Sequence, residues 1–399
     1  MRFTSTILIN WMFIISMAQS SPAPDVEHEP KVVWEFRTNN SVYSSPIVKD
    51  NVVYVGSLDS NLYAIEIKGG KEIWRFQTNG EIRSNVCIAH DTLFLNGGDG
   101  GVYAIDIHKG KLIWVFKTEG EHKYDFADYF QSSPVYQNGV VYIGSGDSSF
   151  YAIDASSGKL VWSFKTSGIV HSTPVIDNNK VFFGSFDGFV YALDKINGQL
   201  VWKFKTVGHM YFPRGEVQGS PAAFHNLIFI GARDYNVYAI DQNKGYCHWN
   251  KAFPDGWGLC NNIHDSVLYI GTSDERRLIA VNPEDGSEYW NKRMEFLVFG
   301  NNGYSENMLY IGTTNGKLHG INLKDGSTAW SFETENYKSA RSKYFKSDDS
   351  YRDDIYSIIT SNEQFLEVEC ELGGIFSTPV IIDDQIIFSS TNGKIYCLR

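Results

Sequence analysis

The chain has few cysteines and prolines, and it has no concentrated block of basic residues. The net charge of −11, with no compensating basic stretch, argues against a nucleic-acid partner. After residue 20 no apolar run is long enough to span a bilayer. The five cysteines match neither zinc-site spacing nor a CxxC redox motif, so no metal site is predicted; they are Cys87, Cys247, Cys260, Cys370 and Cys397.

An odd number of cysteines leaves at least one thiol unpaired in an oxidising compartment. Most of them are predicted to be small buried residues. A Cys370–Cys397 bridge and a Cys247–Cys260 bridge both remain open.

The N-terminus has the pattern of a removable secretory leader. Arg2 precedes an apolar run over residues 7–17, and Ala18-Gln19-Ser20 supplies small residues for cleavage. We therefore predict a signal peptide at 1–20 and a short flexible segment at 21–30. A membrane anchor is the alternative, but the run is too short. The absence of a cysteine after this run excludes a bacterial lipid anchor there. Secretion and a periplasmic location both fit, and Asn39-Asn40-Ser41 would accept a glycan in a eukaryotic host.

Aromatic residues and glycines are plentiful where cysteine and proline are scarce. Aromatics make up 15% of the chain, and 36 glycines outnumber 11 prolines, which favours short strands joined by tight turns. Eight tryptophans are separated by gaps of 40, 40, 48, 40, 47, 41 and 40 residues; they are Trp34, Trp74, Trp114, Trp162, Trp202, Trp249, Trp290 and Trp330. Such a period indicates a repeat architecture.

The segments between the tryptophans repeat as well. VVYVGSLDSNLYAIE (52–66) recurs as VVYIGSGDSSFYAID (140–154) and KVFFGSFDGFVYALD (180–194), and many units begin with a Ser-Ser-Pro-like element. Each repeat contains four short β-runs separated by turn signals. One four-stranded sheet cannot bury both of its faces, so neighbouring sheets must stack radially, as in a β-propeller.

The two ends of the chain determine the number of blades. After Trp330 the chain supplies three strands (376–398) but no tryptophan strand, and a lone tryptophan strand at 32–37 precedes the first repeat. The N-terminal strand is therefore predicted to complete the C-terminal blade. This predicts an all-β, eight-bladed propeller of four-stranded antiparallel blades as a single domain over 31–399.

The motif Tyr-Ala-Ile-Asp-x-x-x-Gly-Lys-x-x-Trp, together with Ser-Ser-Pro at the inner strand, resembles the pyrroloquinoline quinone (PQQ) repeat family. That family includes quinoprotein alcohol dehydrogenases and non-catalytic BamB-type propellers. The resemblance covers residues 31–399, and it implies that the eight tryptophans pack between blades as structural residues.

Three insertions interrupt the period, at about 118–130, 206–217 and 334–375. Each joins an outermost strand to the next inner strand, so all three are predicted on the face that carries the hairpin turns, around the channel mouth. Loops on one face indicate either a partner-facing surface or solvated covers of the blades. The residues proposed to face a partner are Tyr124, Asp125, Asp128 and Tyr129 in the first insertion and His209, Tyr211, Arg214 and Glu216 in the second.

A second candidate site is the residue three positions before the proline of each Ser-Ser-Pro-like element. In repeats that lack this proline, the equivalent residue is counted, and we call both the proline position. These residues start the inner strands, and we call them the mouth ring: Tyr43, Arg83, Gln131, His171, Gln218, Gly258, Phe299 and Phe376. Half of them are polar or charged, which indicates either a ligand site or the lining of a water-filled channel. The repeated aspartates, such as Asp59 and Asp187, occupy equivalent turn positions and do not resemble a paired acid–base site.

Three functions follow from these observations. The first is a secreted or periplasmic non-catalytic scaffold that binds a protein partner. The second, which rests on the resemblance alone, is an oxidoreductase that uses PQQ with calcium; the chain has no adjacent cysteines and no clear Glu-Asn-Asp calcium set, so an enzyme is the less favoured reading. The third is a propeller that binds glycan or extracellular matrix.

Overall fold

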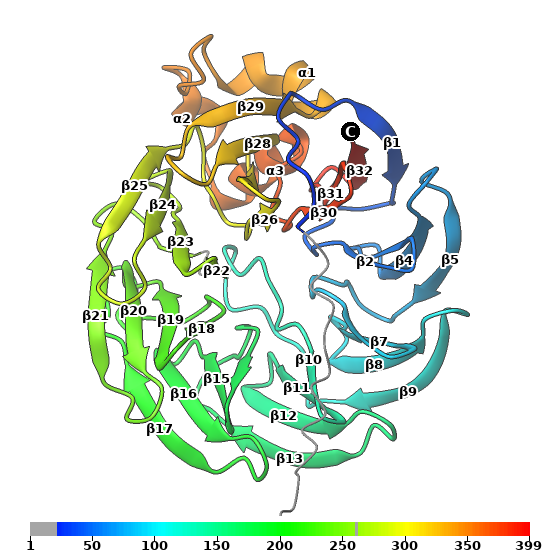
Figure 1. Cartoon of the computed structure of the whole chain (residues 1–399), viewed down its shortest axis with the longest axis vertical. Helices are drawn as coiled ribbons and strands as arrows, with labels where there is room; N and C mark the ends of the chain where they lie inside the picture. Colours follow the sequence, from blue (N-terminus) through cyan, green and yellow to red (C-terminus); the bar gives the residue numbers. More distant parts are fainter. Residues whose placement is uncertain (1–21, 260–261) are drawn as a thin grey trace, which may run out of the picture.

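The computed structural model describes residues 22–259 and 262–399, and within them eight four-stranded antiparallel sheets form a ring (Figure 1). The predicted eight-bladed β-propeller is therefore confirmed. The signal peptide expected at 1–20, Cys260 and the possible Cys247–Cys260 bridge lie outside the described residues. No helix in the described part of the chain combines the length and apolar character needed to cross a membrane.

The strands of each blade follow one another from the channel outward. The first four blades contain β2 (Ile47–Lys49), β3 (Val52–Gly56), β4 (Asn61–Glu66) and β5 (Glu72–Gln77); β6 (Cys87–Ala89), β7 (Thr92–Asn96), β8 (Gly101–Asp106) and β9 (Lys111–Lys117); β10 (Val135–Gln137), β11 (Val140–Gly144), β12 (Ser149–Asp154) and β13 (Leu160–Lys165); and β14 (Val175–Asp177), β15 (Lys180–Gly184), β16 (Phe189–Asp194) and β17 (Leu200–Lys205).

The remaining blades repeat this order. They contain β18 (Ala222–Phe224), β19 (Leu227–Ala232), β20 (Asn236–Asp241) and β21 (Cys247–Ala252); β22 (Asn262–His264), β23 (Val267–Gly271), β24 (Arg277–Val281) and β25 (Glu288–Arg293); β26 (Gly303–Tyr304), β27 (Met308–Thr313), β28 (Lys317–Asn322) and β29 (Thr328–Glu333); and β30 (Val380–Ile382), β31 (Gln385–Ser389), β32 (Lys394–Leu398) and β1 (Val32–Arg37).

The last blade closes the ring as expected. Strand β1 pairs antiparallel with β32, with Trp34 opposite Cys397. Lys31 and Arg399 exchange both backbone hydrogen bonds, at 2.7 and 2.8 Å. The two ends of the chain therefore belong to one sheet, and opening the ring requires breaking a complete strand ladder.

The hairpin turn between the second and third strands has a recurrent hydrogen-bond pattern. The Asp187 carboxylate accepts from the Phe189 N–H at 3.1 Å and from the Tyr191 hydroxyl at 2.7 Å. Equivalent tyrosine–aspartate pairs join Tyr63 to Asp59 and Tyr151 to Asp147. These aspartates shape and hold turns, since an Asp side chain satisfies nearby backbone donors.

Each repeat tryptophan contacts the turn of the following blade. The Trp162 indole N–H donates to the Lys195 carbonyl at 3.1 Å. The ring lies over Gly198, where φ is +71° and a Cβ would stand 2.5 Å from the indole. A side chain there would collide with the indole, so glycine is required by both the backbone and the contact.

The eighth tryptophan has a different partner, because the last blade lacks this turn. The Trp330 indole N–H donates to the Val26 carbonyl at 2.6 Å. Asp25 accepts from the Ser305 hydroxyl at 2.6 Å and from the Asn307 backbone at 2.8 Å. The sequence predicts a short flexible segment at 21–30; within it, Ala23, Asp25 and Val26 bond to the blade of β26–β29, and Val26 supplies the missing carbonyl.

The third insertion is helical rather than an extended loop. It contains α1 (Glu335–Tyr344), α2 (Ile355–Ile358) and α3 (Asn362–Leu372). Thr334 caps α1 and Ser361 caps α3, each by accepting a backbone N–H. In Figure 1 the helices gather over the blade of β30–β32 and its neighbour.

The possible Cys370–Cys397 bridge is not formed. Both residues are free thiols. Cys397 is buried in the core between blades, while the Cys370 sulfur lies 3.6 Å from the Ser41 hydroxyl. Cys370 lies outside the packing cluster that holds Cys397, and no disulfide joins them.

Replacing Trp202 with Phe should lower the free energy of unfolding by about 2 kcal/mol. The change removes the indole N–H that donates to the buried Gln242 carbonyl at 2.9 Å and leaves that carbonyl without this donor. Urea unfolding followed by circular dichroism measures the effect. Tyr246→Phe is the matched control, since it removes only an exposed hydroxyl from the same turn; equal stability of the two variants would contradict the prediction.

Candidate functional site

The first insertion, residues 118–130, crosses the middle of the ring and closes the channel mouth; we call it the plug. Figure 1 shows this cyan segment, which precedes β10, extending across the centre toward β22. Tyr129 is buried against Tyr43, Phe299 and Phe376, with ring centroids 6.3, 5.2 and 5.0 Å away. Four aromatic rings therefore seal part of the mouth.

A buried histidine fixes the plug on the opposite side. His171 donates from Nδ1 to Asp128 at 2.8 Å and from Nε2 to Glu121 at 2.6 Å, and its side chain is fully buried. Burial alone would lower the pKa of His171, but the hydrogen bonds and charges of Asp128 and Glu121 outweigh it and raise the pKa to about 9. The imidazole is therefore protonated at neutral pH. It joins the plug to the segment that leads into the inner strand β14.

Arg233 makes the third connection. It is fully buried directly after β19, and its guanidinium forms a two-pronged ion pair with Asp125 of the plug. Gln218 accepts two further N–H bonds from it, at 2.8 and 3.1 Å. The guanidinium also lies over the rings of Tyr124 and Trp257, at 5.7 and 4.8 Å. A buried charge with this many partners is satisfied where it stands.

The other polar members of the mouth ring also support the plug. Arg83 donates to the Asp128 carbonyl at 2.9 Å, and Gln218 donates to the Ala127 carbonyl at 3.1 Å. Gln131 accepts the Arg83 backbone N–H at 3.2 Å. Arg83, Gln131, His171 and Gln218 therefore hold the plug, and the last three also line the pocket beneath it.

The residues proposed to face a partner divide into two groups. Asp128, Tyr129 and Glu216 are buried, and Asp125 pairs with Arg233. By contrast, Tyr211 is 69% exposed, and Tyr124, Arg214 and the partly covered His209 lie toward solvent. The Tyr124 hydroxyl donates to Glu216 at 2.7 Å and so joins the first two insertions.

The third insertion packs onto the plug. Tyr337, Ile355 and Leu372 belong to one buried cluster with Tyr129 and Phe376. Glu369 of α3 is buried beside this cluster, and burial raises the pKa of its carboxyl to about 8. Both of its carboxyl oxygens lack a hydrogen-bond partner among the described residues.

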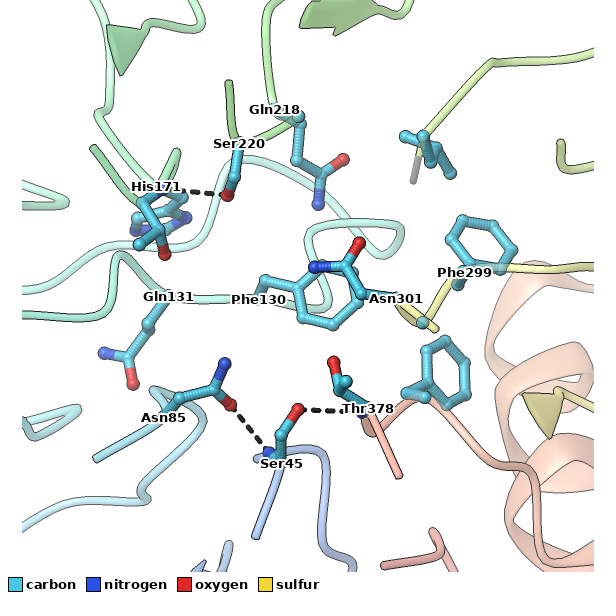
Figure 2. Close-up of a pocket in the computed structure, with 15 residues that line it drawn as sticks. Ser45, Asn85, Phe130, Gln131, His171, Gln218, Ser220, Phe299, Asn301 and Thr378 are labelled. Atoms are coloured by element: carbon cyan, nitrogen blue, oxygen red, sulfur yellow. Dashed lines mark hydrogen bonds between the residues drawn. The ribbon is translucent and has the colours of Figure 1, made fainter. Parts of the chain in front are cut away.

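A belt of small polar side chains surrounds the channel beneath the plug, one residue before each proline position. In the belt, five backbone N–H groups donate to the side chain of a neighbouring blade: Ser45 to Asn85 (2.6 Å), Asn85 to Ser133 (2.9 Å), Ser133 to Thr173 (2.9 Å), Thr173 to Ser220 (3.0 Å) and Thr378 to Ser45 (2.9 Å). Together with Phe130, Phe299 and Phe376, the belt encloses a pocket of about 90 Å³ (Figure 2).

Sequence reasoning missed Arg233, Glu121, Phe130 and the belt. Arg233 had a usable signal, because the equivalent positions in other repeats hold Leu58, Gly98 or Phe186. The belt also had one, since the residue before each proline position is small and polar in most repeats. Glu121 has no repeat counterpart, so nothing in the period marked it. Phe130 stands four residues before the proline position, where six of the other repeats hold an aliphatic residue, so its ring was a departure that the period could have shown.

The repeats, the radial sheets and the closed ring define the class: this chain is an eight-bladed β-propeller of PQQ-like repeats. A family model described as outer membrane protein assembly factor BamB matches residues 27–127, 123–255 and 233–351. The chain belongs to that family. A search of curated proteins by sequence finds no match.

Solved structures show the same fold at low identity. BamB from Moraxella catarrhalis matches with a TM-score of 0.68 and 15% identity, over 93% of this chain and 100% of that one. The computationally designed Ika8 protein matches at 0.68 and 14%, over 90% and 96%. The quinohemoprotein alcohol dehydrogenase ADHIIG from Pseudomonas putida HK5 matches at 0.68 and 13%, over 93% and 76%.

The ion pair at His171 should make the free energy of unfolding fall as the pH rises into the alkaline range. The pKa of about 9 in the folded protein lies above the ordinary value of 6.5, so the stabilisation is complete below 6.5 and is lost as the pH rises through 9. The difference in unfolding free energy between the wild type and His171→Gln should shrink by about 2 kcal/mol between about pH 7 and about pH 9.5.

Urea unfolding at several pH values measures this difference. Glu369 titrates in the same range but is present in both proteins, so its contribution cancels. His225→Gln is the control, because exposed His225 has an equally close carboxylate in Glu284, 2.8 Å away. The prediction is contradicted if the difference in unfolding free energy between the wild type and His171→Gln stays constant with pH.

Proposed function

We propose that this chain is a secreted or periplasmic, non-catalytic propeller that binds a protein partner through the face formed by its insertions. The proposed location depends on the leader pattern of residues 1–20. The observation that carries the binding role is a set of exposed apolar side chains on the second insertion, next to a channel mouth that the plug closes.

The tip of the second insertion is unusually apolar for an exposed loop. Val207, Met210 and Tyr211 are 76%, 78% and 69% exposed. Tyr356 of the third insertion is also exposed. Grouped exposed apolar side chains are typical of protein interaction sites, and methionine and tyrosine adapt well to a partner surface.

The base of this loop is firmly held, which suits a binding element. The Thr206 hydroxyl donates to the Gly188 carbonyl at 2.9 Å, and the Val207 N–H donates to Asp234 at 3.0 Å. Phe212 packs against Trp257, with centroids 5.2 Å apart. A loop with a fixed base loses little conformational entropy when its tip binds. The family description, an assembly factor, is in keeping with this role.

The double variant Met210→Ser/Tyr211→Ser should capture at least about tenfold less partner in a crosslinking pull-down from the native host, since exposed anchors of this kind dominate interfaces. The propeller should stay folded, because both side chains are largely outside the core. Ile196→Ser is the control, as Ile196 is 68% exposed in a blade turn. Equal capture by both variants, or no specific partner with the wild type, would refute the proposal.

A PQQ-dependent oxidoreductase is the second candidate, favoured by the fold shared with the quinohemoprotein dehydrogenases. The residues at the channel do not fit that cofactor. The pocket of about 90 Å³ holds only roughly six water-sized groups, far less than a tricyclic quinone needs. Arg83, His171 and Arg233, the cations that could contact a quinone carboxylate, are already paired with Glu81, Glu121 and Asp125.

Adding PQQ with calcium to the pure protein should therefore give no spectral shift and no dye reduction. A quinone bound at the mouth would have to displace the plug, which costs the plug its buried charged contacts to His171 and Arg233 and its aromatic packing. Absorbance titration and a dye-coupled assay with several alcohols test this. A saturable shift with turnover would establish the oxidoreductase instead.

A further inference from the structure

The channel pocket combines a flat aromatic floor with a rim of hydrogen-bond donors. Figure 2 shows Phe130 in the middle of the pocket, with Ser45, Asn85, Ser220 and Thr378 around it. Phe130 ends the plug and is partly exposed to the pocket. Nothing in the proposed function uses this site.

The belt leaves side-chain hydrogen-bond donors available, beside the second lone pair of each accepting oxygen. The oxygens of Ser45, Asn85, Thr173 and Ser220 each accept a neighbouring backbone N–H. A hydroxyl whose oxygen accepts in this way still carries its hydrogen, and the Asn85 amide keeps both N–H bonds. The rim therefore suits a ligand rich in oxygen acceptors.

The charges around the pocket disfavour an anion. His171 lines the pocket, but both of its ring nitrogens already bond to the carboxylates of Glu121 and Asp128, so no N–H is left for an anion. Neither lysine nor arginine lines the pocket among the described residues. The net charge of −11 would also repel an anion at longer range. The hydrogen-bond donors of the rim disfavour a cation as well, so a neutral ligand remains.

The shape limits the ligand to one ring. A volume of about 90 Å³ corresponds to roughly six water-sized groups, so part of a single six-membered ring fits while the rest remains in solvent. A pyranose has one face of C–H groups that packs on an aromatic ring and a perimeter of hydroxyl oxygens that accept hydrogen bonds. We propose that this pocket binds a single pyranose unit, either free or at the end of a glycan, stacked on Phe130.

Ligand-observed NMR and calorimetry on the full mature chain test the proposal with three probes: methyl β-D-glucopyranoside, methyl α-D-mannopyranoside and N-acetylglucosamine. At least one should bind with a dissociation constant of about millimolar, as expected for one small ring. Phe130→Leu keeps the plug apolar but removes the flat ring, and it should weaken binding about tenfold. Asn301→Ala, which removes a polar side chain that lines the pocket, should weaken it about fivefold.

Phe126→Ala is the matched control, because Phe126 lies on the same plug but is exposed outside the pocket. The affinity of the Phe126→Ala variant for each sugar should equal that of the wild type. The proposal is overturned if none of the three sugars binds folded protein, if Phe130→Leu and Phe126→Ala have equal effects, or if inorganic phosphate binds instead with the same dependence on Phe130. Partner capture by the second insertion is measured separately, so failure here leaves the scaffold proposal standing.

Discussion

The whole structure depends on the contact between one blade's tryptophan and the next blade's turn. The indole N–H donates to a backbone carbonyl, and the ring lies on a glycine with positive φ, as with Trp162 and Gly198. The contact joins adjacent blades, so each sheet has its faces covered only while the ring is complete. At Trp330 the ring would lack this contact, and the N-terminal segment supplies it through Val26. Closure therefore involves both the β1–β32 ladder and a segment outside any repeat.

Regularity at the rim contrasts with irregularity at the centre. The blades place eight inner strands around a channel, and each strand presents its first residues there whatever their identity. A closed propeller would leave this channel open, yet Tyr129, Asp128 and Asp125 of the plug fill its mouth. The buried charges come in opposite pairs because an unpaired one would be costly at this depth. Phe130 then becomes the floor of the pocket below.

The period in the sequence predicted the blades well because every repeat forms the same turn and the same contact with the next blade. Asp187 turns its hairpin and Trp202 docks on the next blade for reasons that recur about every forty residues. Register also singled out His171 and Gln218, which the structure places four residues before the inner strands β14 and β18. Their partners could not be predicted from register. Glu121 reaches His171 across 50 residues of sequence and Asp125 reaches Arg233 across 108.

The sequence by itself determined the number of blades, the joined termini and the three insertions, because these follow from counting repeats and from strands that must pair. Only the tertiary structure decided that the first insertion enters the channel, that the third forms helices over it, and that the mouth ring carries ion pairs rather than an open passage. Repeats specify contacts between equivalent positions on neighbouring blades. An insertion occurs once, so its place depends on which charged and aromatic side chains the closed ring happens to bring within its reach.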